Sequence, residues 1–424
     1  MLVTKFIEEH KDEVINRLVV KGFKAEALVN ELLEIDTQRK KIQTQANNLN
    51  ADLNIKAKEI GAHMKSGQKD VAEVLKQEVS AMKERVTILT TEQEVAEQKL
   101  KNILTYLPNL PHESVPHGKT ANDNVVVRSG GVEPNLPADA LPHWELAKKY
   151  DLIDFEAGVK IAGAGFPLYK GKCARLQRSL ISFFLDQANN SGYQEVIPPF
   201  MVNEESGFGT GQLPDKEGQM YHVVMDNFYL IPTSEVPLTN IYRHNILEVS
   251  DFPVKITAYS PCFRREAGSY GKDVRGLNRL HQFDKVEIVR IEHPEHSYQA
   301  LDEMVAHVEM LVQKLELPYR IVKLCGGDMS FASALTYDFE VYSAAQKMWL
   351  EVSSVSNFES FQANRLKLRY RDDHNKKTQL AHTLNGSALA LPRIVAALLE
   401  NGQKTNGILL PKVLHPYTGF DIIN

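Results

Sequence analysis

The stretch KITAYSPCFRREAGSYGKDVRGLNRLHQFDKVEIVRIE, residues 255–292, decides which fold this chain adopts. It begins and ends with runs rich in β-branched and aromatic residues, and a glycine-containing segment joins the two runs. This pattern predicts two neighbouring strands connected by a long loop. Arg264, Arg265 and Glu266 follow the first run directly. Taken alone, this triplet fits either the solvated rim of a sheet, where most charged residues lie, or a site that holds an anion.

Short strands and helices also alternate over the rest of this half of the chain. Further predicted strands occupy residues 193–199, 334–343 and 347–356, and predicted helices occupy residues 174–188 and 391–402. Residues 385–387, Asn-Gly-Ser, predict a tight turn before the last of these helices, and Pro392 fits its first turn. Strand pairs of the hairpin type with flanking helices indicate an α+β domain with an antiparallel sheet, and not a parallel doubly wound one.

The first hundred residues carry a different pattern, in which apolar residues recur at alternating steps of four and three. The first run is Leu28, Leu32, Ile35, Ile42, Ala46, Leu49 and Leu53, and the second is Leu75, Val79, Met82, Val86, Leu89, Ala96, Leu100 and Ile103. These are heptads of a coiled-coil seam, and Gly61 and Gly67 between the runs fit a helix reversal. We therefore expect an antiparallel helical hairpin about 50 Å long that projects into solvent.

The heptads leave the role of this arm open between a dimerisation coiled coil, a scaffold rod and a probe for a large partner. Its charge does not decide among them, because residues 1–104 contain equal numbers of basic and acidic side chains. Residues 107–124 then break the periodicity with prolines and polar residues, which marks a domain boundary.

The composition is that of a soluble globular protein. The chain has 424 residues, of which 43% are hydrophobic and 24% charged, with a formal net charge of −5. No apolar run approaches the roughly 20 residues of a membrane span, and the start of the chain lacks the apolar core of a signal peptide. Cys173, Cys262 and Cys325 are widely spaced, so they suit a reducing cytosol and form no zinc-ligand pattern. We expect a cytoplasmic protein without membrane contact.

The common nucleotide-binding loops and metal motifs are absent from the sequence. Phosphate binding would therefore fall to arginine, whose planar, permanently charged group suits it. Besides the Arg264 triplet, the candidates are residues 279–287, where Phe283 could stack on a base, and residues 384–393, where Arg393 opens a helix. Taken alone, each of these features is more often purely structural. A phenylalanine on a strand usually belongs to the core, and an arginine at the start of a helix usually lies on the solvated surface.

Their joint order resembles the class II aminoacyl-tRNA synthetases. Residues 174–199 resemble motif 1 of that class, residues 256–288 motif 2 and residues 384–401 motif 3. The stretches PTSEVPLTN, TYDFEVY and EVSSVSNFESFQANR narrow the resemblance, which covers essentially the whole chain, to the bacterial-type seryl-tRNA synthetases. It implies a class II catalytic domain over residues 106–424 and a tRNA-binding helical hairpin arm over residues 1–105.

This resemblance implies a serine–tRNA ligase. Such an enzyme activates L-serine with ATP and Mg²⁺ to seryl-adenylate and transfers serine to the 3′ end of tRNA(Ser). The family is homodimeric, and no zinc is expected here; whether tRNA(Sec) is also charged stays open. Two alternatives are a carrier-protein aminoacyl ligase, whose relatives lack the arm, and a coiled-coil interaction protein with an inactive synthetase-like domain. A synthetase-like domain that has lost its activity should also have lost the arginines that contact phosphate, yet Arg264 and Arg393 are both present.

The resemblance also implies a role for each site residue. Arg264 and Arg393 are expected to act in catalysis on the α- and γ-phosphates, where positive charge must be in place before two anions meet. Phe283 is expected to stack on adenine. Glu266, which strand alternation predicts on the same face as Arg264, is expected to accept a hydrogen bond from the adenine amino group or to help orient the nucleotide. The remaining expected ATP ligands are Arg265, Glu351, Val352, Ser353 and Ser354, with Mg²⁺ on Glu351 and Ser354. The expected serine ligands are Thr233, Ser234, Glu235, Arg264, Glu287 and Ser387.

Overall fold

The computed structural model describes residues 1–216, 218–266, 275–373 and 376–424. Most of the segment expected to join the two strands of the opening stretch, residues 267–274, therefore lies outside the described residues. The chain divides into two compact units. The first contains residues 1–19 and 23–108, and the second contains residues 20–22 and 109–424.

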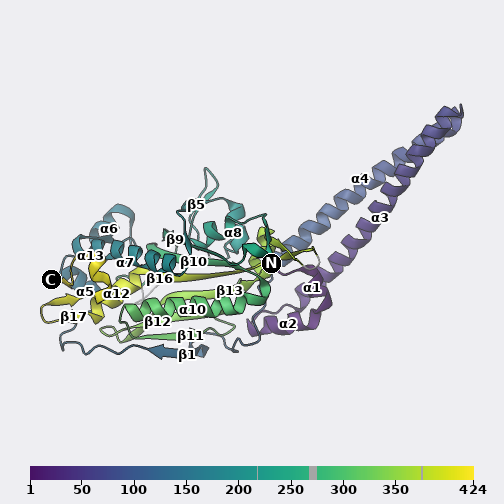
Figure 1. Ribbon diagram of the computed structural model, residues 1–424. Coiled ribbons are helices and arrows are strands. Elements are labelled where there is room, and N and C mark those ends of the chain that lie inside the picture. The colour runs from purple at the N-terminus through teal and green to yellow at the C-terminus, as the bar shows by residue number, and fades with distance from the viewer. Residues whose placement is uncertain (217, 267–274, 374–375) are drawn as a thin grey trace. The chain divides into compact units, whose positions relative to one another are not determined.

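The first unit is a helical hairpin preceded by two short helices. Its helices are α1 (Thr4–Glu9), α2 (Lys11–Val20), α3 (Glu26–Lys65) and α4 (Lys69–Tyr106). The long helices α3 and α4 lie side by side (Figure 1), and Lys56 pairs with Glu78 across them at 2.5 Å. Leu32 and Leu89, both predicted seam residues, are fully buried, so the coiled-coil arm is confirmed. Gly67 supplies the reversal with a φ of +79°, whereas Gly61 lies inside α3.

The second unit is built on an eight-stranded sheet. In spatial order the strands are β1 (Val125–Gly130), β11 (Tyr319–Lys323), β12 (Leu335–Ser343), β13 (Met348–Glu359), β16 (His382–Ala390), β10 (Gln282–Glu292), β9 (Val254–Phe263) and β4 (Gln194–Glu195). Every neighbouring pair is antiparallel except β4 and β9. The two strands of the opening stretch are β9 and β10, which pair directly with each other. The antiparallel α+β prediction is confirmed.

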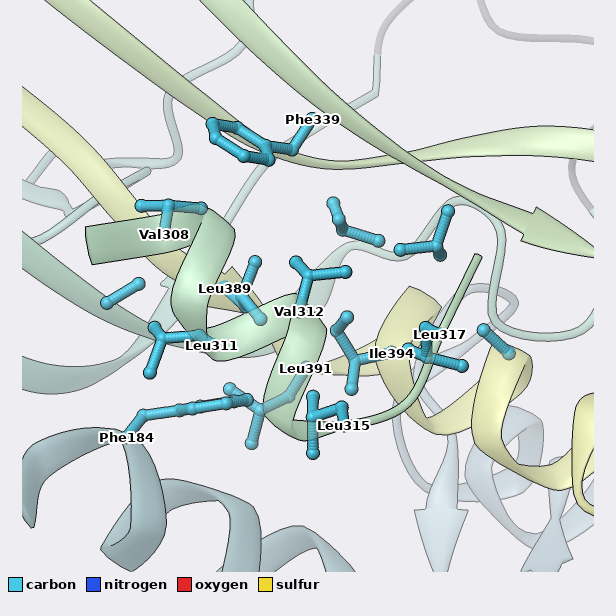
Figure 2. Close-up of a cluster of buried hydrophobic side chains, with 14 of the residues drawn as sticks. Phe184, Val308, Leu311, Val312, Leu315, Leu317, Phe339, Leu389, Leu391 and Ile394 are labelled. Atoms are coloured by element: carbon cyan, nitrogen blue, oxygen red, sulfur yellow. The ribbon is translucent and has the colours of Figure 1, made fainter. Parts of the chain in front are cut away.

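One face of this sheet carries the main hydrophobic core. The helices on it are α5 (His143–Lys149), α7 (Gly171–Asn190), α10 (Ser297–Lys314) and α12 (Leu391–Asn401). Figure 2 shows Val308 and Val312 of α10 lying between Phe339 of the sheet and Phe184 of α7. The predicted helices over residues 174–188 and 391–402 are α7 and α12, and Pro392 stands in the first turn of α12.

The opposite face of the sheet is covered by α9 (Glu235–Asn240) and α11 (Ser360–Leu366). Leu238 of α9 packs with Val289 of β10, and Ala363 of α11 packs with Ile291 of the same strand. Side chains alternate along a strand, so Lys285 and Glu287 share this face with Val289 and Ile291. Charged residues of a central strand are thereby enclosed between the sheet and two short helices.

The predicted turn at residues 385–387 was wrong. These residues lie inside β16, where Gly386 pairs with Ile288 of β10 on one side and with Val355 of β13 on the other. A Cβ atom at Gly386 would lie 3.2 Å from Cγ2 of Val355, so the glycine permits close packing. Ladder pairing on both edges of the strand overrides the local turn preference of Asn-Gly.

Smaller elements complete the second unit. The other helices are α6 (Phe155–Ala162), α8 (Glu204–Thr210) and α13 (His415–Thr418), with short 3-10 turns at Ala121–Asp123, Val249–Asp251, Pro294–His296 and Lys412–Leu414. The other strands are β2 (Ile153–Asp154), β3 (Leu168–Tyr169), β5 (Met201–Val202), β6 (His222–Val223), β7 (Phe228–Leu230), β8 (Ile246–Glu248), β14 (Arg369–Arg371), β15 (Thr378–Leu380), β17 (Gln403–Lys404), β18 (Gly407–Leu409) and β19 (Ile422–Ile423). Within the described ranges, no helix combines the length and apolarity needed to cross a bilayer.

Candidate active site

A buried ion pair lies at the centre of the covered sheet face. Glu287 of β10 is only 1% exposed, and its Oε2 lies 2.6 Å from Nζ of Lys285. The same ammonium donates a hydrogen bond to Oγ1 of Thr233 at 2.9 Å, and the Ser387 hydroxyl donates to Glu287 at 3.4 Å. The structure thus brings together three of the predicted serine ligands, Thr233, Glu287 and Ser387, around a lysine that the sequence analysis did not name.

A second buried carboxyl belongs to Glu235, the first residue of α9. Its Oε1 accepts a hydrogen bond from Nε2 of Gln362 at 2.7 Å, and the Gln362 oxygen accepts one from Thr383 at 2.7 Å. Burial, and then the negative charge of Glu287, raise the pKa of Glu235 to about 7. A carboxyl in this situation gains from a nearby cation, because the cation offsets both causes of the shift.

The segment that leads into α9 is fastened to the sheet by its hydroxyl groups. The Ser234 hydroxyl lies 2.5 Å from that of Ser260 on β9, and both side chains are buried. Oγ1 of Thr233 accepts a hydrogen bond from the backbone N–H of Glu235 at 3.2 Å. Residues 233–235 therefore have a fixed position above β9 and β10.

Arg264 lies at the more open end of the same two strands. Its backbone N–H donates to the His281 carbonyl at 2.9 Å, which joins the residues flanking β9 and β10. Its guanidinium carbon lies 5.1 Å from the ring centroid of Phe283. The two predicted nucleotide ligands therefore form a cation–π pair, with a delocalised charge beside an aromatic face.

The prediction that Glu266 shares a strand face with Arg264 was wrong. Strand β9 ends at Phe263, and Glu266 has a φ of +48°, so side-chain alternation does not extend to it. The carboxylate of Glu266 instead pairs with Arg279 at 3.0 Å. Arg265 is exposed, and its backbone N–H donates to the carbonyl of Gln219 at 2.8 Å.

Arg393 is held at the start of α12 by two backbone carbonyls. Its Nη1 donates to the Glu351 carbonyl at 2.7 Å, and its Nε donates to the Asn278 carbonyl at 3.1 Å. The carboxylate of Glu351 lies 3.8 Å from the same guanidinium. These contacts fix the plane of the guanidinium while 28% of the side chain stays exposed.

Oxygen ligands suited to a hard cation lie on β12 and β13. The Ser354 hydroxyl donates to Oδ1 of Asp338 at 2.5 Å. Burial, and then the charge of Glu351, raise the pKa of Asp338 well above its usual value. A divalent cation beside Glu351 and Ser354 would offset this repulsion, and carboxylate and hydroxyl oxygens are ligands that Mg²⁺ prefers.

The two residues between Glu351 and Ser354 stabilise the sheet through packing and an interstrand hydrogen bond. Val352 belongs to the hydrophobic core, so only its backbone is available to a ligand. The Ser353 hydroxyl donates to the carbonyl of Ser387 at 2.6 Å, which joins β13 to the next strand.

Among the described residues, one other group of side chains could hold a metal: His293, Glu295 and His296 have ligand atoms within 4.8 Å of one another. It includes none of the predicted site residues.

Sequence reasoning missed Lys285, Asp338 and Gln362. Lys285 could have been found, because it stands two residues before Glu287 on a strand and must share its face. Asp338 pairs with Ser354 in the β12–β13 register, but that register is not readable from the sequence. Gln362 gave no signal, since α11 reaches Glu235 only through tertiary packing.

Comparisons with known proteins give a consistent result for both units. Residues 1–111 match the seryl-tRNA synthetase N-terminal domain, and residues 221–402 match the tRNA synthetase class II core domain (G, H, P, S and T). The chain is 51% identical to the serine–tRNA ligase of Salinibacter ruber over 421 residues, 99% of this chain and 98% of that protein. It is 45% identical to the serine–tRNA ligase of Chlorobaculum parvum over an alignment of 427 positions that covers 100% of both chains.

Solved structures with the same fold include two proteins in complex with nucleotides. The seryl-tRNA synthetase of Pyrococcus horikoshii complexed with ATP has a TM-score of 0.91 and 35% identity, covering 100% of this chain and 99% of that chain. The cytoplasmic serine–tRNA ligase of Naegleria fowleri in complex with AMP has a TM-score of 0.87 and 26% identity, with the same coverage. The class II fold with its helical arm is thereby confirmed.

Proposed function

This chain belongs to the seryl-tRNA synthetase family, and from that membership we propose that it activates L-serine with ATP to seryl-adenylate and transfers serine to the 3′ end of tRNA(Ser). It is an aminoacyl-tRNA synthetase of the class II fold. The observation that carries the choice of substrate is the buried pair of Glu287 and Lys285 beside the second buried carboxyl, Glu235.

In this proposal the serine ammonium lies against Glu235 and stabilises its ionised form, which offsets the burial and the Glu287 charge that raise the pKa of this carboxyl to about 7. The serine hydroxyl donates to Glu287, which Lys285 and Ser387 hold in place. Alanine would leave this carboxylate short of a donor, and such a loss gives strong rejection. Threonine is excluded by size alone, which is worth only about 1–3 kcal/mol per methylene.

The nucleotide lies along the arginines. Arg264 contacts the α-phosphate and the serine carboxylate, Phe283 stacks on adenine, and Arg393 contacts the γ-phosphate. Glu266 and Arg265 lie close to the nucleotide, and residues 351–354 line its phosphates. No side-chain nucleophile is needed, because the serine carboxylate itself attacks the α-phosphate. The bond between the α- and β-phosphates breaks, pyrophosphate leaves and seryl-adenylate forms, so positioning and charge carry the chemistry.

The predicted cation is Mg²⁺, with Glu351 and Ser354 as its protein ligands. When bound, the ion supplies positive charge to the phosphates. Asp338 accepts a hydrogen bond from the Ser354 side chain, and we propose that this bond orients the Ser354 hydroxyl oxygen toward the ion. Zinc has no role in this proposal.

The arm, residues 1–105, is proposed to bind tRNA, and residues 106–424 are proposed to carry catalysis as a cytoplasmic homodimer that meets through motif 1. The presence of α3 and α4 favours this function over a carrier-protein ligase. Whether tRNA(Sec) is a second substrate is a matter for the charging assay.

The test is ATP–pyrophosphate exchange with each of the twenty amino acids, with and without tRNA. We expect exchange that depends on serine and does not require tRNA. Exchange with another amino acid and not with serine would refute the choice of substrate. No exchange with any amino acid would favour the inactive-domain alternative.

A further inference from the structure

A completely buried carboxylate, Glu400, lies in the last turn of α12, away from the substrate ligands described above. Its Oε1 accepts hydrogen bonds from the backbone N–H of His143 at 2.9 Å, from Nδ1 of His143 at 2.7 Å and from Nε2 of Gln346 at 2.8 Å. Its Oε2 accepts one from the Ser343 hydroxyl. Four donors thus satisfy the oxygen atoms of a buried carboxyl group, which would be costly to bury without partners.

These contacts determine the protonation of His143, which is also completely buried. Its Nε2 lies 2.8 Å from the backbone nitrogen of Leu277, which can only donate, so Nε2 is the acceptor and carries no proton. The single ring proton is therefore on Nδ1, where Glu400 accepts it. The backbone comes unusually close here: Gly276 has a φ of +65°, and a Cβ atom on it would lie 2.2 Å from Nε2.

Leu277 belongs to the part of the β9–β10 connection that leads back into β10, and the next residue holds an arginine of the active site. The carbonyl of Asn278 accepts a hydrogen bond from Nε of Arg393 at 3.1 Å. The side chain of Asn278 donates to Gln346 at 3.1 Å, and Gln346 itself donates to Glu400. Two routes therefore run from Glu400 to Asn278, one through His143 and Leu277 and one through Gln346.

We propose that His143 is a positioning residue for ATP binding: its neutral imidazole, oriented by Glu400, holds the backbone at Leu277 and Asn278 so that Arg393 is aimed at the nucleotide. The proposal rests on the proposed function, because it takes Arg393 as a phosphate ligand. It differs from a purely structural role in one respect. Loss of the Nε2 acceptor should weaken ATP binding specifically. The hydrogen bonds described for His143 and Glu400 include none to Glu235, to Glu287 or to the partners of these two carboxyls.

Two substitutions test the hydrogen bonds of the two ring nitrogens separately. His143→Asn can still donate to Glu400 from the position of Nδ1 but cannot reach Leu277. His143→Gln can still accept from Leu277 from the position of Nε2. In ATP–pyrophosphate exchange we expect His143→Asn to raise the KM for ATP by about tenfold, the usual effect of one buried hydrogen bond. The KM for serine should change by less than about twofold, and His143→Gln should recover most of the loss.

His307→Gln provides a matched control. His307 is a largely buried histidine of α10 whose Nδ1 lies 3.1 Å from the Ser191 hydroxyl, and it belongs to neither binding site. It should lower the melting temperature and leave both KM values unchanged. If His143→Asn behaves in the same way, or raises the KM values for ATP and serine equally, the proposal is overturned.

A second variant covers the case in which His143→Asn does not fold. His143→Gln keeps the acceptor for the backbone N–H of Leu277, so its KM for ATP should stay within about threefold of that of the unmodified enzyme. A KM for ATP raised about tenfold or more in this variant would overturn the proposal. Equilibrium dialysis with a non-hydrolysable ATP analogue gives the same comparison without turnover. If the unmodified enzyme binds the analogue but shows no serine-dependent exchange, the proposed function fails while the role of His143 is still decided by the variants.

Discussion

Replacing Glu235 with glutamine should remove a pH dependence from both the stability and the substrate affinity of this enzyme. The pKa of Glu235 is raised from 4.5 to about 7 by burial and by the charge of Glu287. Between these values the folded protein holds a proton that the unfolded chain has released. Its free energy of unfolding therefore falls as pH rises from about 4.5 to about 7, and the loss is complete above that range.

The size of this effect follows from the shift. At 1.36 kcal/mol per pH unit, a shift from 4.5 to about 7 corresponds to about 3 kcal/mol. Urea unfolding at pH 5 and pH 8, compared between the enzyme and Glu235→Gln, should show that the variant lacks most of this difference. Glutamine keeps the shape of the side chain and can still accept a hydrogen bond from Gln362, so the packing is matched.

Serine affinity should change in the opposite direction with pH. The serine ammonium is bound best by the ionised form of Glu235, so the KM for serine should fall about tenfold per unit as pH approaches 7 from below and then level off. Steady-state ATP–pyrophosphate exchange from pH 5.5 to 8.5 at saturating ATP measures this. A serine KM that is flat across that range, or equally pH-dependent in Glu235→Gln, would refute the role of this carboxyl.

Three further substitutions or treatments have defined outcomes. Lys285→Met leaves Glu287 buried without its ion-pair partner and should lower the free energy of unfolding by about 3–5 kcal/mol in urea denaturation; a loss below about 1 kcal/mol would contradict the buried pair. Arg264→Ala should lower kcat/KM for exchange by at least about a hundredfold, the usual effect of removing a preplaced group that stabilises developing charge; a rate within tenfold of the unmodified enzyme would count against its role. EDTA should abolish exchange and Mg²⁺ restore it, and Glu351→Gln should raise the Mg²⁺ concentration for half-maximal activity about tenfold or more. An unchanged Mg²⁺ requirement in that variant would exclude Glu351 as a ligand, and activity that returns only with Zn²⁺ would overturn the choice of metal.

Much of the fold follows from periodicity alone. The heptads place Leu32 and Leu89 in the seam between α3 and α4, because a step of seven residues keeps a side chain on one helix face. The runs of β-branched and aromatic residues at the two ends of the stretch 255–292 likewise predict β9 and β10. Turn preference was a poorer guide: residues 385–387 carry a turn signal, but pairing on both sides holds them in the strand β16.

Some contacts of the site can likewise be predicted from the local sequence, whereas others depend on tertiary packing. Lys285 and Glu287 stand two residues apart on a strand, so their shared face is readable from the sequence. The alternation cannot extend to Glu266, because the backbone leaves the strand at Phe263 and turns into the left-handed region. His143 and Glu400 are 257 residues apart, and their hydrogen bond depends on how α5 meets α12 in three dimensions.

We propose that the second unit activates serine and that the first unit brings tRNA to it. The most direct test is to delete residues 27–104 and measure two reactions on the same preparation, serine-dependent ATP–pyrophosphate exchange and charging of tRNA(Ser). The division of the chain predicts that exchange stays close to that of the full chain while charging is lost. Charging that persists unimpaired without α3 and α4 would contradict a tRNA-binding role for the arm.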